Sequence, residues 1–582
     1  MSFFDKLIVY VPPVSRKPSN TVLEKLKQLN LIVSSEDTNV TVRCPFSGSK
    51  RNEHYARYVL PSEKEPYGKF ECPKCWQRGI SSFLNRLKIS EDQIVPKGKI
   101  ILQPSALDRI NVALATELAL GKRIFVCEET LVVVRYQNHE AIGYSPLQLA
   151  DLRIEACRQT NFYRPNRRLV DPPENILKTV FSSIEAQQIL PHIRGFIYRP
   201  LLRKTGDIVS QPGYDPQSNL FIIMNPKKFT TLQTQPSKSD AQKSLNELLN
   251  LLSEFPFATE EDRAAAVACL LTAVMRQELN SAPMFLVTAH SSGSGKSTFC
   301  ELASIIATPH HTPSISFPTK NEEASKLLSS LLSTSPAVVH FDNVVGVIPA
   351  LDSLCTCLTS SYIMHRILGT SSVQRLGTRF LMLANGNNVS VEADMTRRTL
   401  VIYLNSKEEI PAEKEFQNPL LLNYAREHRE ELITHILRII QAWILEGSPT
   451  SPTRYRVVSF QDWQHWCIEP LLWLGLSDPL LKMRQAIRED PIRQELSELF
   501  LALQQQFGSQ RFNVKNIQEA LANPSAKSGL NEILEKMNLF VEKRLNTRSL
   551  GWRLKQNKDR IINHLQLEQI ETGTYRIREI EN

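Results

Sequence analysis

Apolar residues recur along the middle of the chain with the two periods that are typical of helices and of strands. Residues 256–405 open with a helical pattern, EEDRAAAVACLLTAVMRQ, and continue as alternating strands and helices, which predicts a parallel α/β sheet. Upstream, FVCEETLVVVRY predicts a pair of strands and LQLADLRIEACRQ predicts an amphipathic helix. IRGFIYRPLL and LFIIM predict further strands around the turn cluster QPGYDPQSN, and the polar segment 231–244 predicts a linker or an exposed loop.

Both ends of the chain differ from this middle region. Residues 406–500 are predominantly helical in pattern and include the aromatic-rich stretch WQHWCIEPLLWLGL. Residues 501–582 give helical patterns and then a strand pair that ends in TYRIREI, an order that suits a small winged-helix domain. Residues 40–90 combine a cysteine pair with many charged and turn residues, so we expect a separate small domain there.

The composition bounds the class of protein. A chain of 582 residues is too long for one hydrophobic core, so several domains are expected. With 42% hydrophobic and 22% charged residues it has an ordinary globular composition, and no run reaches the ~18–20 apolar residues that span a bilayer. The N-terminus, MSFFDKLIVYVPP, has an early acid and no small-residue cleavage site, so we expect no signal peptide and a cytoplasmic protein. Ten cysteines are too sparse for a disulfide scaffold, and the net charge of +9 is consistent with a polyanionic partner.

The sharpest chemical signal is FLVTAHSSGSGKST at 285–298, an apolar strand followed by a Ser/Gly loop and a helical pattern. Backbone N–H groups that converge on phosphate oxygens require glycines in the loop, and the N-terminus of the following helix favours negative charge. We therefore predict an ATP-binding loop in which Lys296 reaches the β- and γ-phosphates and the Ser297 hydroxyl holds Mg²⁺. His290 stands at the first loop position, where glycine is usual. The predicted ATP-binding residues are Ser292, Gly293, Ser294, Gly295, Lys296, Ser297 and Thr298.

A second strand, PAVVHFDNV at 336–344, ends in Asp342 and Asn343. At the carboxyl edge of a parallel sheet, Asp342 would lie beside the phosphate-binding loop and orient Mg²⁺ and its water ligands. ATPases with such a phosphate-binding loop usually have a glutamate directly after this aspartate, and the glutamate polarises the attacking water. Asn343 takes that position here, so Asp342 and Asn343 are both candidate catalytic residues and the identity of the general base stays open.

A third strand, TRFLMLANGNN at 378–388, ends in a cluster of amides. A neutral amide at a strand end can hydrogen-bond the attacking water and the γ-phosphate without adding charge. Asn385 and Asn387 are both candidates for this role, although Asn-Gly clusters are also common in turns.

Two arginines, Arg397 and Arg398, precede the next strand pattern in VEADMTRRTLVIYL. An arginine at such a place can project from one subunit onto the nucleotide of its neighbour and stabilise transition-state charge, provided that the protein forms rings. A surface pair bound to solvent is the structural alternative. Arg366, in HRILGTS, is a second candidate for the projecting arginine.

The order of these motifs within residues 290–398 resembles AAA+ ATPases, in particular the superfamily 3 helicases and related replication ATPases of phages, plasmids and integrative elements. The resemblance covers roughly residues 200–480, through the segments PGYDPQSNLFI, SAPMFLVTAHSSGSGKS, FDNV, RILG, ANGNN, DMTRRTL and WLGLSDP. It implies a homo-hexameric ring that threads DNA and hydrolyses ATP between subunits.

Cys44, His54, Cys72 and Cys75 form the one group in the sequence with metal-ligand spacing. Two thiolates separated by two residues can bind one ion from a tight turn, and a distant Cys and His complete a tetrahedron, so we predict a Zn²⁺ site. The pattern CPF…F-x-C-P-x-C resembles the zinc-binding domain of bacterial and phage primases, in which a His usually stands three residues after the first Cys. Ser47 stands there instead, so His54 is the expected fourth ligand; a reduced CxxC turn without metal is the alternative.

Basic and aromatic residues surround this cysteine group. Cations can bind phosphates while rings stack on bases, so the segment suits single-stranded nucleic acid, although a solvated surface would have the same composition. The residues are Arg43, Lys50, Arg51, Arg57, Lys64, Lys69, Lys74 and Arg78, with Tyr55, Tyr58, Phe70 and Trp76. Primer synthesis needs a carboxylate cluster for two metals, and residues 95–200 carry no such acidic set, so polymerase activity is not expected.

The C-terminal stretch EKRLNTRSLGWRLKQNKDR at 542–560 is strongly basic. A helix is expected from Ser549 to Lys558, followed by a strand pair that would form a wing, and together they suit a DNA-reading element. A solvated basic helix that packs on the rest of the protein is the alternative. The basic residues are Lys543, Arg544, Arg548, Arg553, Lys555, Lys558 and Arg560.

These inferences predict an α/β multidomain protein that acts as an ATP-dependent DNA helicase or replication-initiation ATPase of a mobile genetic element. DNA, single-stranded or forked, is the expected partner, with a possible separate primase or replication protein and no membrane. One alternative, left open by the missing glutamate beside Asp342, is an ATP-binding origin-recognition or loader scaffold without processive unwinding; another is a defence or regulatory ATPase triggered by DNA. The expected domains are a primase-like zinc-binding domain (1–92), a mixed α/β linker domain (93–255), an AAA+ P-loop ATPase domain (256–405), a helical domain (406–500) and a winged-helix-like DNA-binding domain (501–582).

Overall fold

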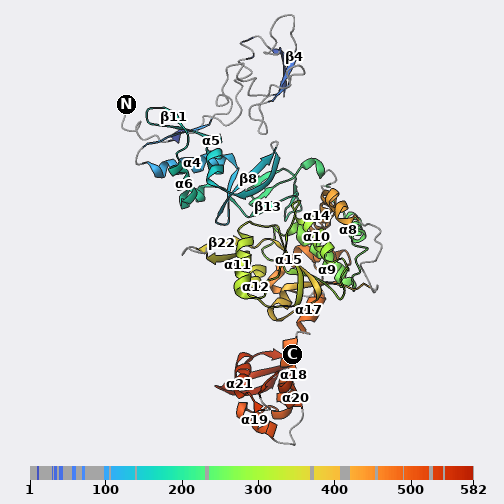
Figure 1. The fold of residues 1–582 in the computed structure, drawn as a ribbon. Helices are drawn as coiled ribbons and strands as arrows, with labels where there is room; N and C mark the ends of the chain where they lie inside the picture. The colour runs from blue at the N-terminus through green and yellow to red at the C-terminus, as the bar shows by residue number, and fades with distance from the viewer. Residues whose placement is uncertain are drawn as a thin grey trace. The chain divides into compact units, whose positions relative to one another are not determined.

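The computed structural model divides the chain into two compact units, and each is described by itself (Figure 1). The first unit comprises Met1–Pro200 and Ser210–Lys227, and the second comprises Leu201–Val209 and Lys228–Asn582. The structure describes residues 97–103, 106–137, 140–229, 232, 235–366, 373–406, 420–452, 456–488, 491–522, 529–541 and 544–580, with short segments between residues 10 and 71.

The first unit is a mixture of short sheets and helices. Its antiparallel strands β7 and β8 confirm the strand pair that FVCEETLVVVRY predicts, and α5 confirms the amphipathic helix. An apolar core forms where Ile110, Leu114 and Leu118 of α4 pack with Ile124 and Val126 of β7. The elements are β1 (Tyr10–Val11), β2 (Ile32–Ser35), β3 (Asn39–Arg43), β4 (Tyr55–Val59), β5 (Lys69–Glu71), β6 (Gly98–Ile101), α4 (Leu107–Gly121), β7 (Ile124–Cys127), β8 (Thr130–Gln137), β9 (Glu140–Pro146), α5 (Leu149–Gln159), β10 (Thr160–Tyr163), β11 (Leu169–Val170), α6 (Glu174–Ser182), α7 (Ile184–Ile189), β12 (His192–Ile193), β13 (Gly195–Ile197), β16 (Gly213–Asp215) and β17 (Leu220–Ile222).

The second unit contains a five-stranded parallel sheet in the order β19-β20-β23-β18-β24, which confirms the parallel α/β pattern of residues 256–405. In a parallel sheet all the carboxyl ends lie at one edge, so the loops after these strands gather there. The strands are β18 (Met284–Ala289), β19 (Ser314–Ile315), β20 (Val338–Ile348), β23 (Leu381–Val391) and β24 (Thr399–Leu404).

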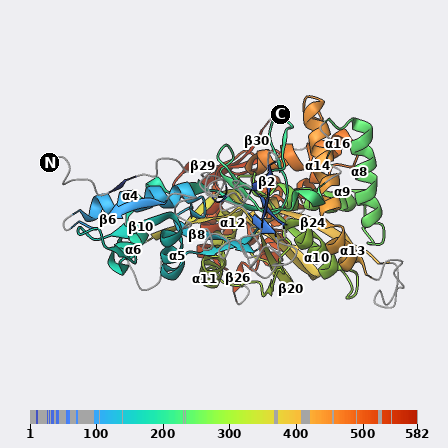
Figure 2. The ribbon, with the colours of Figure 1, turned by 90° about the horizontal axis from the view of Figure 1, so that it is seen from above.

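Helices cover this sheet, and α8, α9 and α14 lie side by side (Figures 1 and 2). Every residue of α9 from Ala264 to Met275 is buried, which explains why its sequence is apolar on all sides. Among the described helices, none combines the length and the apolar character that crossing a bilayer requires. The helices are α8 (Lys238–Leu251), α9 (Glu260–Met275), α10 (Lys296–Ala307), α11 (Asn321–Leu332), α12 (Asp352–Thr359), α13 (Leu421–Glu427), α14 (Arg429–Leu445), α15 (Gln461–Cys467), α16 (Glu469–Trp473) and α17 (Leu480–Arg488).

The expectation of a linker over 231–244 is wrong in its second half, because α8 begins at Lys238. Ser237 and Asp240 cap this helix reciprocally: each side chain accepts a hydrogen bond from the backbone N–H of the other residue (3.3 and 3.1 Å). Such a capping box satisfies N–H groups that would otherwise lack partners, so a polar segment can start a helix.

The C-terminal part of the second unit has an apolar core of its own, built around Phe500, Leu503, Ile517, Leu550 and Leu567. Its sheet has the order β25-β30-β29-β28, and α21 and the β29–β30 hairpin confirm the helix and the strand pair expected in this region. The elements are α18 (Pro491–Phe507), β25 (Phe512–Asn513), α19 (Val514–Ala522), α20 (Gly529–Lys536), β26 (Phe540–Val541), β27 (Arg544–Leu545), α21 (Thr547–Gln556), β28 (Ile561–Ile562), β29 (Leu565–Glu571) and β30 (Thr574–Glu579).

Candidate nucleotide-binding site

The Ser/Gly loop lies between β18, which is wholly buried, and the N-terminus of α10. Gly295 caps the helix with a φ of +88°, a left-handed conformation that favours glycine. A Cβ atom at Gly295 would also lie 3.3 Å from the ring of Phe255. Ser294 is buried, and Ser292, Gly293 and Ser297 are exposed. The predicted strand–loop–helix arrangement is confirmed, and the N–H groups of the first turn of α10 face the loop.

Lys296 folds over this loop. Its Nζ atom donates a hydrogen bond to the carbonyl oxygen of Ser291 (2.8 Å), and the residue is only 8% exposed. Burial lowers the pKa of the ammonium group. A partly desolvated cation held by a loop carbonyl can exchange that partner for an anionic oxygen, which is a stronger acceptor.

Asp342 and Asn385 meet at the carboxyl edge of the sheet, next to the first turn of α10. The register of β20 against β23 shifts between Phe341 and Val344, and Asn343 in this bulge has a φ of +54°. Nδ2 of Asn385 donates to Oδ1 of Asp342 (2.7 Å) and to Oγ of Ser297 (3.0 Å). The Ser297 hydroxyl is itself 3.4 Å from Oδ1 of Asp342. Residues from three separate motifs therefore form one hydrogen-bonded cluster.

The cluster depends on a close approach of β20 and β23. Gly386 pairs with Val344, and a Cβ atom at Gly386 would lie 2.0 Å from the Val344 carbonyl oxygen. The backbone N–H of Asn343 donates to Oδ1 of Asp342 (2.8 Å), which helps to fix the carboxylate. The Asn343 side chain is exposed, and as an amide it cannot serve as a general base.

His340, which the sequence interpretation missed, fixes the orientation of the Asn385 amide. Nε2 of His340 lies 2.6 Å from Oδ1 of Asn385, and both residues are buried. An ionised carboxylate only accepts hydrogen bonds, so the amide must turn its NH₂ group to Asp342 and its oxygen to His340. Nε2 must then carry a proton, and Nδ1 faces the Ser314 hydroxyl at 3.4 Å. A signal existed: His340 interrupts an apolar strand two positions before Asp342.

The two candidate asparagines differ in environment. Asn385 is 1% exposed and belongs to the cluster, whereas Asn387 is exposed and pairs with Ala289 at the end of β18. Strand residues alternate between faces, so Asn385 and Asn387, two positions apart, lie on the same face of β23. Only the register of β23 against β18 and β20 decides which of the two is buried.

His290, in the place of the usual glycine, is tied to two neighbouring strands. Its ring nitrogens lie 2.8 Å from Oδ1 of Asn388, at the end of the β23 amide cluster, and 2.8 Å from the Tyr403 hydroxyl on β24. The imidazole ring also packs edge-on against the Tyr403 ring. His290 therefore connects the start of the loop to the strands on both sides of β18.

Arg397 and Arg398 lie at the opposite edge of the sheet from the loop. Thr399, which follows them, pairs with Met284 at the amino end of β18. The length of β18, roughly 17 Å at 3.3 Å per residue, separates the two places. Both arginines pair with Asp394; the Arg397 side chain is 55% exposed, whereas that of Arg398 is 11% exposed. Neither arginine is near the loop of its own chain. The other candidate, Arg366, is the last residue of the hairpin strand β21 (Tyr362–Arg366).

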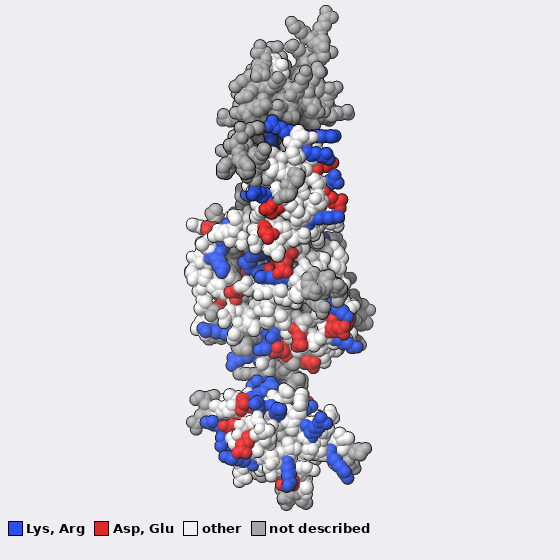
Figure 3. Space-filling view, turned by 90° about the vertical axis from the view of Figure 1, so that its left-hand side faces the viewer, with Lys and Arg blue, Asp and Glu red and all other residues white. Residues whose placement is uncertain are grey.

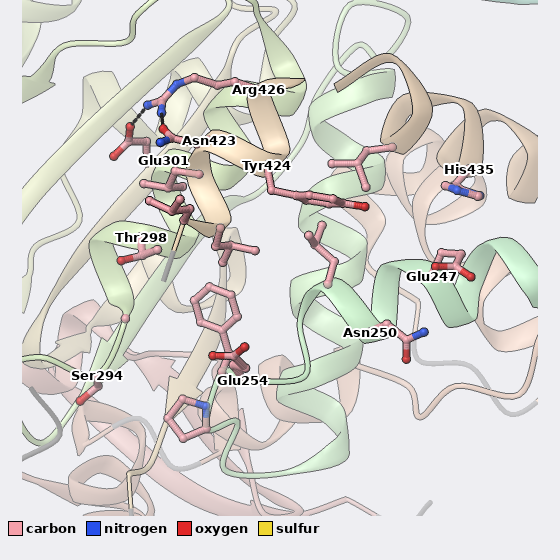
Figure 4. A pocket seen from close by; sticks show the side chains of 18 of the residues that line it. Glu247, Asn250, Glu254, Ser294, Thr298, Glu301, Asn423, Tyr424, Arg426 and His435 are labelled. Carbon is pink, nitrogen blue, oxygen red and sulfur yellow. Dashed lines mark hydrogen bonds and ion pairs between the residues drawn. The ribbon is translucent and has the colours of Figure 1, made fainter. Parts of the chain in front are cut away.

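A pocket of about 630 Å³ opens beside the loop and shares Gly293, Ser294, Gly295 and Thr298 with it (Figure 4). Polar side chains of α8 and α14 form the far wall, where burial lowers the pKa of His435 and favours its neutral form. On the α10 side of the pocket, Arg426 of α13 binds Glu301 of α10 and Asn423 (Figure 4). Among the lining residues are Glu247, Asn250, Glu254, Phe255, Leu420, Tyr424 and His435.

The predicted zinc ligands Cys44, His54, Cys72 and Cys75 lie outside the described residues. Within the part of the chain that the structure describes, no group of three or more His, Cys, Asp or Glu side chains is placed to hold a metal.

Comparisons with known proteins give distant structural likenesses. No protein-family model matches the chain, and no curated protein matches it. The apo C-terminal region of NrS-1 is similar at 12% identity over 77% of this chain and 86% of that one, with a TM-score of 0.31. SCCmec type IV Cch, described as an active helicase, is similar at 11% identity over 78% and 91%, with a TM-score of 0.30. JCV helicase with a bound small molecule is similar at 17% identity over 44% and 74%, with a TM-score of 0.18. At such TM-scores the likeness carries no inference about function.

Proposed function

We propose that the protein is a nucleoside triphosphate hydrolase, with ATP as the substrate, that acts as a motor on DNA. The observation that carries the proposal is the cluster of Asp342, Asn385 and Ser297 beside the Lys296 loop. Triphosphate hydrolysis needs a cation near the β- and γ-phosphates, oxygen ligands for Mg²⁺ and a donor that positions water, and this cluster offers each of them.

Ser297 and Asp342 fit Mg²⁺. They present a hydroxyl and a carboxylate oxygen 3.4 Å apart, and Mg²⁺ prefers oxygen ligands, with phosphates and waters completing its shell. Mg²⁺ bound there would neutralise part of the negative charge of the phosphates. Lys296 would bind the β- and γ-phosphates, and the loop from Ser292 to Thr298 would hold the remaining phosphate through its N–H groups. The Asn385 NH₂ group donates to Asp342 and to Ser297, and the donor released when Ser297 turns to the metal would orient the attacking water. Asn343 supports Asp342, while Asn387 takes no part in this scheme.

The pocket beside the loop suits the nucleoside of the same ligand. It shares four residues with the loop, so a nucleotide whose phosphates bind there has its ribose and base at the pocket. Its walls combine the rings of Phe255 and Tyr424 with hydrogen-bonding groups such as Asn250, a composition that suits a flat heterocycle.

Arg397 is the proposed residue that acts on a neighbouring subunit. It is exposed, and the length of β18 separates it from the loop of its own chain. A ring of subunits, hexameric by the sequence resemblance, would bring it to the next nucleotide, where a guanidinium stabilises charge on the transferred phosphoryl group. Arg398, paired with Asp394 and largely buried, instead supports the turn that carries Arg397.

The remaining parts of the proposal concern DNA. The C-terminal order of α18, β25, α19, α21 and the β29–β30 hairpin, with β25 paired to β30, supports a winged-helix DNA-binding domain over 501–582. Three further parts of the proposal rest on the sequence alone. They are the zinc-binding domain of 1–92, the domain boundaries at residues 255, 405 and 500, and a role in replicating a phage or an integrative element. Because Asn343 replaces a glutamate, a loader scaffold that binds ATP without processive unwinding is the second candidate.

The test measures nucleotide binding, hydrolysis and strand displacement on forked DNA for the full chain and for Lys296→Ala. Lys326→Ala is the matched control, since Lys326 is an exposed lysine that pairs with Glu322 on α11. We expect Lys296→Ala to abolish hydrolysis and the control to retain it. Hydrolysis without strand displacement would favour the loader. A folded wild-type protein that fails to bind any nucleotide would refute the proposal.

A further inference from the structure

One face of α21 is exposed and both basic and aromatic. Leu550 and Leu554 are buried in the C-terminal core, whereas Arg548, Trp552 and Lys555 are exposed. Positions separated by three or four residues lie on the same side of a helix, so the indole lies between the two cations. Trp552 is 62% exposed, although a large aromatic side chain gains much from burial.

The two cations on this face are available to an anionic partner. Neither Arg548 nor Lys555 has an ion-pair partner within the described residues, whereas Arg553, on the inner side of the helix, pairs with Glu495 and donates to the Met537 carbonyl oxygen. Figure 3 shows Lys and Arg side chains on the surface of the C-terminal part. Arg548 and Lys555 can therefore take phosphate groups as partners without breaking an ion pair within the described residues.

The hairpin does not share this character. Arg576 on β30 pairs with Glu568 on β29, and the exposed charges of the hairpin are mixed: Arg578 is accompanied by Glu579 and by Glu571, at the end of β29. A wing that approached phosphates would place these carboxylates against them, which is unfavourable. Among the described elements of the C-terminal part, the α21 face is the surface that combines exposed cations with an exposed large aromatic ring.

We propose that the α21 face binds nucleic acid at unpaired bases, with Trp552 stacking on a base while Arg548 and Lys555 bind the flanking phosphates. The base faces of an intact duplex are covered by their neighbours, so an exposed indole gains a stacking partner where bases are unpaired. This surface lies outside the nucleotide site, and the inference rests on the part of the proposed function that takes 501–582 as a nucleic-acid-binding domain.

The experiment measures binding of the full chain, without nucleotide, to a fluorescein-labelled strand of about 20 nucleotides and to a blunt duplex of the same sequence; a single module covers about 4–16 nucleotides. Trp552→Ala is expected to weaken binding to the single strand about ten-fold and to leave duplex binding within about two-fold. Trp552→Phe, which keeps a ring, is expected to retain most of the affinity for the single strand.

Salt dependence separates the roles of the residues. Arg548→Ala and Lys555→Ala are each expected to reduce the slope of log affinity against log salt by about 0.7, whereas Trp552→Ala leaves the slope unchanged. Lys515→Ala, on α19, is the matched control because Lys515 is exposed and pairs with Glu519. Equal losses on strand and duplex for Trp552→Ala, or unchanged binding in all the variants, would overturn the proposal and favour a protein-binding face. Unchanged basal ATP hydrolysis in the variants would show that such a failure leaves the nucleotide site intact.

Discussion

Replacing His340 by leucine is expected to slow ATP hydrolysis without weakening nucleotide binding. The substitution removes the proton that Nε2 directs at Oδ1 of Asn385, 2.6 Å away, and leaves a side chain of similar size in the buried strand. The NH₂ group of Asn385 is then held towards Asp342 and Ser297 by those two residues alone. Lys296 and the loop, which in the proposed scheme carry most of the phosphate contacts, are unchanged.

The magnitude follows from the contacts of the amide. Leaving the buried Oδ1 atom without a donor costs about 1–3 kcal/mol, and the amide can relieve this cost by rotating. Rotation would turn the amide oxygen towards the Asp342 carboxylate, and this is unfavourable because both groups are hydrogen-bond acceptors. The productive orientation therefore loses about 1–3 kcal/mol, which corresponds to a fall in turnover of about 5- to 150-fold, with a nucleotide dissociation constant changed by less than about three-fold.

The assay is steady-state hydrolysis together with equilibrium binding of a fluorescent ATP analogue. His340→Gln keeps a donor near the position of Nε2 and is expected to restore most of the turnover. Ser314→Ala is a milder control, since its hydroxyl lies 3.4 Å from Nδ1 of His340. In a background of Asn385→Ala the leucine substitution should have little further effect, because both changes act through one amide. Full turnover in His340→Leu, or losses that multiply in the double variant, would refute the reasoning.

Four further predictions concern other parts of the site and the cysteines. Gly386→Ala is expected to destabilise the fold by about 3 kcal/mol, measured by urea unfolding, because the added Cβ meets the Val344 carbonyl oxygen at 2.0 Å. Arg397→Ala should abolish hydrolysis while retaining stability, and mixing it with Lys296→Ala should recover some activity if the arginine acts between subunits; no recovery would place its role within one chain. Alkylation at pH 8, followed by peptide mass spectrometry, should label exposed Cys157 before buried Cys357 and Cys467, since burial raises the pKa of each of these two thiols to about 12 and keeps them protonated. If zinc is bound, Cys44, Cys72 and Cys75 should react only after a chelator is added, and their immediate reaction would exclude the metal.

Local sequence was enough to predict the strand–loop–helix arrangement at 285–298 and the strands around it. Glycines, a following lysine and an apolar strand are contiguous in FLVTAHSSGSGKST, and each requirement is local. Helix α8 was missed because the polar composition of 231–244 outweighed the Ser237–Asp240 capping pair, which is a weaker signal but decides where the helix starts.

Contacts between strands could not be predicted in the same way. Asn385 and Asn387 are the same residue type and stand two positions apart near the end of one strand. Their difference in burial follows from the register of β23 against β18 and β20. The contacts of His290 with Asn388 and Tyr403 join residues about a hundred positions apart, so no local pattern reveals them. The role proposed for Arg397 would require a neighbouring subunit, and the predicted zinc ligands lie outside the described residues.

The pairing of Gly386 with Val344 has a consequence for how the chain assembles. At this residue pair the two strands approach so closely that a Cβ atom on residue 386 would not fit. If β23 shifted by one residue in either direction, Asn385 or Asn387 would come opposite the bulge and bring a Cβ atom into the carbonyl oxygen. Either misalignment would therefore meet a steric clash before any ligand is present, and the alignment that avoids it is the one that brings Asp342, Asn385 and Ser297 together.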